Sequence, residues 1–262
     1  MDIEKERERI AKFIKAGLFG LSFVVLASCI FFYIPRAVSA FHQEAKTKEM
    51  PIRSVCCNEK KVALSFDVSG GEKKVEEILD VLDEQGIPAA FFMTGDWIQK
   101  HPDAVRKIYE AGHDIGNHSQ SHKQMERLSK EDCIRQIKEA HKLVKDMLGV
   151  DMNLFRAPYG EFSKNILEAS RQSGYYPIKW NVDSKDWKDY GTAAIVNEIC
   201  NNQELKEGSI VLCHTSTKFI KNALNKVVLV LQKRGYSFER ISDMIYKYDY
   251  HLNKDGRQIQ NS

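Results

Sequence analysis

From residue 61 onward, short apolar runs of strand type alternate regularly with segments of helical periodicity. Residues 61–66 and 89–93 are rich in β-branched and aromatic side chains. Between them apolar residues recur at helical spacing from Val75 to Gln85, and Gly86 follows as the expected C-cap. Further strands are predicted at 114–118, 154–158, 176–183, 208–214 and 236–242, and further helices at 102–112, 129–148, 165–174, 193–199 and 220–234. This alternation predicts a parallel α/β sheet or barrel of about seven strands.

Polar side chains lie at or next to the ends of five of these predicted strands. They are Asp67, His118, Arg156, Asp183 and His214. In parallel α/β folds the carboxyl ends of the strands share one face, where binding and catalytic sites are built. We therefore expect these side chains to meet in one cleft.

The segment GNHSQSH places His118 and His122 close enough to hold one metal ion between them. Neutral imidazoles suit a borderline cation such as zinc, with water in an open position. A His-x3-His spacing alone is equally typical of two surface residues. A metal lowers the pKa of bound water and polarises a carbonyl group. Asp67 is then the candidate base for the water proton, and His214 the candidate acid for a leaving amine.

Two further residues are candidates for orienting this acid and base. Arg156 can hold the Asp67 carboxylate by charge-assisted hydrogen bonds, and Asp186 can hold His214 and favour its protonated form. The alternatives are a surface ion-pair role for Arg156 and a turn role for Asp183 and Asp186, because Asp favours turns. The sequence alone does not decide whether Asp183 or Asp186 orients His214.

Tyr159 and Trp187 are candidates for contacting the substrate. The backbone N–H of Tyr159, in the segment RAPYG, can face a developing oxyanion. The indole of Trp187 offers a flat apolar wall on which a sugar can stack, although a core position for Trp187 is the simpler alternative.

The segments SFDV, HSQSH, RAPYG, DSKDW and LCH resemble, in this order, the motifs TFDD, HSxxH, RxPYG, DxxDW and LxH of the NodB-like polysaccharide deacetylases, carbohydrate esterase family four. The resemblance covers roughly residues 58–245. It implies a distorted seven-stranded (β/α) barrel and metal-dependent removal of acetyl groups from N-acetylated sugars. It further implies that Asp67 is the base, that His118 and His122 bind the metal, that His214 is the acid, and that Leu212 lines the acetate pocket.

Val68 departs from the family pattern, because the family's third metal ligand, an Asp, falls at this position. An isopropyl group cannot coordinate a cation, so zinc, or cobalt, manganese or nickel in its place, is left with fewer than three protein ligands. The metal is then completed by water or substrate, or Asp67 becomes a ligand, or catalysis is lost while the groove is kept. The form FDxSxG resembles a subgroup of these deacetylases that is linked to spore formation.

An uncharged apolar run spans residues 16–34, roughly 28 Å at ~1.5 Å per residue, which matches a bilayer core. The excess of Lys and Arg before it predicts a cytoplasmic N-terminus and an exported domain. The expected organisation is a cytoplasmic stub (1–15), a transmembrane anchor (16–34), a linker (35–57), a deacetylase domain (58–250) and a frayed polar tail (251–262). Cleavage after Ala40 as a signal peptide is the alternative, with a secreted domain.

These features predict a membrane-anchored hydrolase that deacetylates a cell-wall glycan, either peptidoglycan or a chitin-like oligosaccharide. One alternative is a degenerate module that binds the wall glycan without catalysis, and another is an amidase that acts on peptides. The net charge is +3 and basic residues are scattered among acidic ones, so no nucleic-acid partner is expected. The sequence does not indicate an oligomeric state.

Overall fold

The structure is a computed structural model that describes residues 50–261. The predicted stub, the predicted transmembrane anchor and most of the predicted linker lie outside the described residues. Within residues 50–261 no helix is both long enough and apolar enough to cross a membrane.

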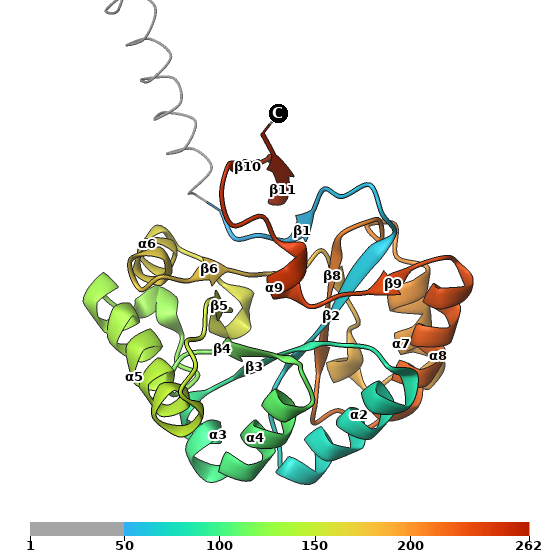
Figure 1. Cartoon of the computed structure of the whole chain (residues 1–262), viewed down its shortest axis with the longest axis horizontal. Helices are drawn as coiled ribbons and strands as arrows, with labels where there is room; N and C mark the ends of the chain where they lie inside the picture. The colour runs from blue at the N-terminus through green and yellow to red at the C-terminus, as the bar shows by residue number, and fades with distance from the viewer. Residues whose placement is uncertain (1–49, 262) are drawn as a thin grey trace, which may run out of the picture. The chain divides into compact units, whose positions relative to one another are not determined.

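A curled, largely parallel sheet forms the centre of the fold, and most of the helices lie along its outer side (Figure 1). Its parallel strands follow the order β8-β2-β3-β4-β5-β6, while β7 pairs with β8 and β9 pairs with β2. They are β2 (Lys61–Asp67), β3 (Ala90–Met93), β4 (Asp114–Asn117), β5 (Leu154–Phe155), β6 (Tyr176–Pro177), β7 (Val182–Asp183), β8 (Ser209–His214) and β9 (Ser237–Phe238). The prediction of a parallel α/β fold is confirmed, in the form of a curled half-barrel.

The predicted helices form close to their expected bounds, and their ends are fixed by local chemistry. Gly86 ends α2 with a left-handed φ of 62°, which glycine adopts without steric cost. Ser129 caps α5, because its side chain accepts a hydrogen bond from the backbone N–H of Asp132. The helices are α2 (Glu72–Gln85), α3 (Gly95–Lys100), α4 (Pro102–Glu110), α5 (Lys130–Leu148), α6 (Lys164–Gln172), α7 (Thr192–Cys200), α8 (Ile220–Lys233) and α9 (Ile241–Met244).

Residues 176–183 were expected to form one strand, and this prediction is wrong. The segment divides into β6 and β7 because the chain changes partners between them. β6 pairs with β5, Ile178 then forms a bridge with Ile52, and β7 pairs with β8. The strand predicted over 236–242 is shorter in the structure, because β9 ends at Phe238 and α9 follows.

The polar C-terminus is not a frayed tail, contrary to expectation. Strands β10 (Tyr250–Leu252) and β11 (Arg257–Gln260) form a hairpin, and β11 also pairs in parallel with β1 (Ser54–Val55). β1 lies within the segment expected to be a linker, so both ends of the predicted domain extend into the sheet. The polar residues of the C-terminus form specific hydrogen bonds. Gln258 is fully buried; its Oε1 accepts from the backbone N–H of Tyr246, and its Nε2 donates to the Tyr246 carbonyl.

Candidate active site

Asp67 and His214 lie side by side at the ends of two neighbouring parallel strands. They are register partners in the β2–β8 ladder, so their side chains leave the sheet on the same side. His118 and Arg156 directly follow the two residues that pair in the β4–β5 ladder. Asp183 ends β7, which pairs with β8. The structure thus brings the five residues to one edge of the sheet. Asp67, His118, Asp183 and His214 line the pocket there, whereas Arg156 is buried and contacts Asp67 instead of lining the pocket.

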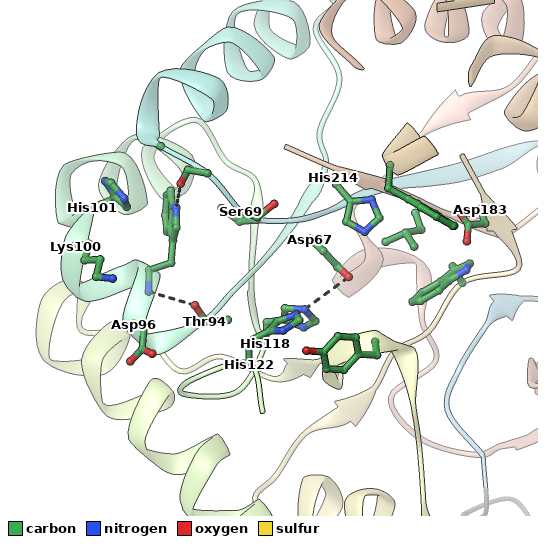
Figure 2. A pocket seen from close by; sticks show the side chains of 18 residues that line it. Asp67, Ser69, Thr94, Asp96, Lys100, His101, His118, His122, Asp183 and His214 are labelled. Atoms are coloured by element: carbon green, nitrogen blue, oxygen red, sulfur yellow. Dashed lines mark hydrogen bonds and ion pairs between the residues drawn. The ribbon is translucent and has the colours of Figure 1, made fainter. Parts of the chain in front are cut away.

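A pocket of about 1010 Å³ opens at this edge of the sheet. Figure 2 shows Asp67 between His214 on one side and the His118–His122 pair on the other. Asp183 lies at the far end of the pocket. The geometry therefore places the Asp67 carboxylate among the imidazoles of His118, His122 and His214 in one pocket.

A buried guanidinium group holds the Asp67 carboxylate. Arg156 Nη1 donates to Asp67 Oδ1 at 2.7 Å, Nη2 donates to Ser65 Oγ at 2.8 Å, and the guanidinium lies 4.0 Å from the centre of the Phe92 ring. Arg156 is 0% exposed, so the alternative of a surface ion pair is wrong. Burial raises the pKa of Asp67, but the charge of Arg156 and its hydrogen bond to the carboxylate outweigh burial and lower this pKa overall. Asp67 is thus a carboxylate over the ordinary pH range.

The side chain that orients His214 is Asp186, not Asp183. His214 Nδ1 donates to Asp186 Oδ1 at 2.8 Å, and the backbone N–H of His214 donates to Oδ2 at 2.7 Å. Asp183 instead accepts a hydrogen bond from the backbone N–H of Lys185, as expected of a turn residue. Burial lowers the pKa of His214, but the hydrogen bond and charge of the fully buried Asp186 outweigh it and raise this pKa overall. The outcome favours an imidazolium facing the pocket.

His118 presents a free lone pair to Asp67. Its Nδ1 lies 2.8 Å from the carbonyl oxygen of Arg156, and because a carbonyl only accepts, Nδ1 is the donor. Nε2 then faces Asp67 Oδ2 at 3.7 Å. Burial lowers the pKa of His118 to about 4 and also lowers the pKa of His122. Both imidazoles are therefore neutral near pH 7, the form that binds metals.

Val68 occupies the position where the family resemblance places a third metal ligand. Its side chain is 5% exposed, lines the pocket and belongs to the main apolar cluster. Among residues 50–261 no group of three or more His, Cys, Asp or Glu side chains is arranged to hold a metal ion. The rings of His118 and His122 lie 5.0 Å apart between centroids. The residues present thus do not fit a metal site with three protein ligands, and supply two nitrogen donors at most from this pair.

The candidate substrate contacts all line the pocket. Trp187 is 58% exposed, so the alternative of a core position is wrong. Leu212 is buried at the pocket wall. The ring centroids of Tyr159 and His122 lie 4.8 Å apart. Tyr159 has a left-handed φ of 62°, a conformation that is uncommon outside glycine. Gly160 follows with a φ of 67°, and a Cβ there would lie 2.4 Å from the Trp180 ring, so the tight turn requires this glycine.

Part of the pocket wall comes from residues that the sequence did not single out. α3 contributes Asp96, Trp97 and Lys100, and His101 lies between α3 and α4. Asp96, Lys100 and His101 lie at the opposite end of the pocket from Asp183 (Figure 2). α3 itself was not predicted. The available signal was Thr94, which follows a strand and caps the helix by accepting from the backbone N–H of Trp97.

The chain is similar to known deacetylases over most of its length. The family model described as polysaccharide deacetylase matches residues 54–178. A peptidoglycan-N-acetylglucosamine deacetylase from Bacillus cereus is 31% identical over 197 residues, which are 73% of this chain and 91% of that protein. This chain belongs to the polysaccharide deacetylase family. The predicted family and enzyme class, polysaccharide deacetylase, are thereby confirmed.

Solved structures of this deacetylase family have the same fold. A crystal structure of a peptidoglycan N-acetylglucosamine deacetylase matches with a TM-score of 0.72 and 29% identity, covering 77% of this chain and 95% of that one. A mutant of a pseudoenzyme from carbohydrate esterase family four, with restored enzymatic activity, matches with a TM-score of 0.71 and 26% identity. The match to the mutant covers 75% of this chain and 71% of that one.

Proposed function

We propose that this deacetylase removes N-acetyl groups from a cell-wall glycan, with peptidoglycan as the first candidate and chitin-like oligosaccharides as the second. The observation that carries the proposal is the placement of Asp67 and His214 side by side in one pocket. Their environments push their pKa values in opposite directions, so one is a carboxylate while the other favours its proton. Such a pair is the usual signature of a general base and a general acid.

In the proposed reaction Asp67 accepts a proton from a water molecule as that water attacks the acetamide carbonyl carbon. The developing oxyanion lies against the backbone of Tyr159, and Leu212 lines the space for the acetyl methyl group. His214 then donates its proton to the amine nitrogen as the C–N bond breaks, which yields acetate and a free amino sugar. Trp187 provides a surface for the sugar ring.

His118 and His122 are the proposed nitrogen ligands of a divalent metal, zinc in the first place and cobalt, manganese or nickel as alternatives. A bound metal acidifies water and polarises the carbonyl group. Because Val68 supplies no carboxylate, we expect weak binding that water or substrate completes. The steps assigned to Asp67 and His214 do not depend on it.

The proposed location is the outer face of the cell membrane. The apolar run 16–34 would anchor the chain with its N-terminus in the cytoplasm, or processing after Ala40 would release the domain. Mass spectrometry of the mature chain from membrane and medium fractions separates these alternatives. A role in spore formation, suggested by the FDxSxG form around Asp67, belongs to the same proposal and is tested by deleting the gene and scoring spores.

Acetate release is the direct test of the proposed reaction. The purified full chain, with its metal content measured on the same sample, is incubated with peptidoglycan and with chitin oligomers. Asp67→Asn and His214→Ala should abolish release, whereas His251→Ala, a half-exposed histidine in the C-terminal hairpin, should retain it. Release of a peptide amine without acetate would instead indicate an amidase.

A second candidate is a glycan-binding module that has lost catalysis. Val68 favours it, as does the similarity to a pseudoenzyme whose activity was restored by mutation. This candidate predicts that the chain sediments with insoluble peptidoglycan but releases no acetate at any metal concentration. It further predicts that His214→Ala leaves the cellular role intact.

A further inference from the structure

The loop that carries the two histidines has an unfavourable backbone conformation. Ser119 and His122 both have left-handed φ angles, 69° and 51°, although neither is glycine. Such residues cost free energy and persist only when surrounding contacts over-determine them. Something outside the loop must therefore supply those contacts.

Asn117 supplies the first of them. It is fully buried at the end of β4, and its Oδ1 accepts a hydrogen bond from the backbone N–H of Ser119 at 2.9 Å. Ser119 Oγ in turn accepts from the backbone N–H of His122 at 3.1 Å. Both left-handed residues are thus tied to the Asn117 amide, directly or through one hydroxyl.

Two acceptors, the Tyr175 hydroxyl and the Ile137 carbonyl, orient that amide. Asn117 Nδ2 donates to the Tyr175 hydroxyl at 3.1 Å and to the carbonyl of Ile137 at 2.9 Å. Both acceptors lie on the same side, so Oδ1 is turned toward Ser119. If the amide flipped, Nδ2 would face the Ser119 N–H, and two donors would oppose each other.

The Tyr175 hydroxyl accepts from Asn117 only because its own proton is used elsewhere. Its oxygen lies 2.6 Å from His141 Nδ1, and His141 Nε2 lies 3.2 Å from Asp151 Oδ1. A carboxylate only accepts, so Nε2 carries the imidazole proton and Nδ1 accepts from the tyrosine. One directed chain of hydrogen bonds therefore runs from the half-exposed His141 to the histidine loop.

We infer that Tyr175 is a positioning residue: through Asn117 it fixes the loop that places His118 and His122 at the pocket. Tyr175 is itself buried and does not line the pocket. Its influence on activity rests on the proposed function, but its influence on the loop does not. The inference is therefore tested first on the loop itself.

Tyr175→Phe removes only the hydroxyl, and Tyr176→Phe is the matched control. The neighbouring Tyr176 hydroxyl donates to the carbonyl of Lys247 and has no link to the loop. We expect amide hydrogen exchange at Ser119 and His122 to accelerate roughly two- to tenfold in Tyr175→Phe, the range of one hydrogen bond. It should stay unchanged in Tyr176→Phe. Unchanged exchange at both amides in Tyr175→Phe would overturn the inference.

A second pair of variants tests the direction of the hydrogen bonds. His141→Leu removes the acceptor of the Tyr175 proton, which should then point at Asn117 Nδ2, weaken that hydrogen bond and accelerate exchange at Ser119. His141→Gln keeps an acceptor oxygen and should restore slow exchange at Ser119. Equal exchange rates in the two variants would contradict the relay.

Activity provides a third measurement, which can fail without affecting the first two. If the chain is a deacetylase, Tyr175→Phe should lower kcat roughly two- to tenfold, with a smaller change in KM. A chain that releases no acetate in any form refutes the proposed function, while the exchange data still decide the role of Tyr175. An unchanged kcat together with faster exchange would overturn the link to activity.

Discussion

Val68→Asp should create a metal site with three protein ligands. Its effects on folding stability without metal and on metal affinity can both be estimated. Val68 is 5% exposed and lines the same pocket as His118 and His122. Its backbone N–H donates to the carbonyl of Phe92, so β-type pairing keeps the position in place. Asp has nearly the shape of Val, and the new carboxylate should therefore face the two imidazoles without a shift of the chain.

Without metal the variant should be less stable than the natural chain. Burial of a side chain such as Val contributes about 1.5–3 kcal/mol, and this contribution is lost while a carboxylate is placed next to that of Asp67. With metal, a third ligand should strengthen binding at least tenfold, or about 1.4 kcal/mol. Zinc at a hundred times its Kd should then add about 2.7 kcal/mol to the stability of the folded state.

Calorimetric titration with zinc, together with thermal melts with and without zinc, measures both effects. Val68→Asn is the matched control, because it has the same shape and lacks the charged ligand. We expect Val68→Asp to melt below the natural chain without zinc and to gain more from zinc than Val68→Asn does. Equal zinc affinity in the two variants would refute the placement of the metal between His118 and His122.

Three further outcomes are expected. kcat/KM should fall at alkaline pH as His214 loses its proton. Because the pKa of His214 is raised, this fall should occur above the ordinary histidine pKa of about 6.5. Asp186→Asn should move the alkaline limb to lower pH. The pKa of Asp67 is lowered in the folded chain, so the stability contributed by its ion pair with Arg156 is present above the unfolded-state pKa and is lost as pH falls through the folded-state pKa. Arg156→Met should lower the free energy of unfolding, measured in urea at pH 7, by about 3–5 kcal/mol. The loss should be smaller when Arg156→Met is combined with Asp67→Asn. Lys100 lines the pocket, so Lys100→Gln should raise KM for peptidoglycan more than for uncharged chitin oligomers. Equal effects on both substrates would contradict a contact with an anionic substituent.

The strand ends were predictable because hydrophobic periodicity marks where each strand stops. Asp67 and His214 each end an apolar run, whereas His118 follows the short segment DIGN and is marked by its place in the strand–helix alternation. Their convergence then required only the rule that parallel strands share one carboxyl edge. The choice of Asp186 over Asp183 was not predictable, because both belong to one short polar segment. Only the fold shows which of them reaches the His214 imidazole.

The elements that escaped prediction depend on long-range pairing. The C-terminal hairpin is polar in sequence, and it is ordered by pairing of β11 with β1, some 200 residues earlier in the chain. The break between β6 and β7 arises because Ile178 meets Ile52, a contact that no local pattern records. α3 was missed because six residues are too few for a clear helical period.

The structure shows which polar residues of the site distinguish an active deacetylase from a binding module that has lost catalysis. Arg156 is fully buried and Asp67 neutralises it, so a chain that had lost activity would still need both residues for stability. Their presence therefore does not separate an enzyme from a degenerate binder. His214 is different, because its imidazole faces the pocket and its side chain is 26% exposed. Asp186 would keep its bonds to the backbone N–H of residue 214 and to Thr217 without that imidazole. Stability gives little reason to keep the imidazole, and the His214–Asp186 pair is accordingly the feature that favours an active deacetylase.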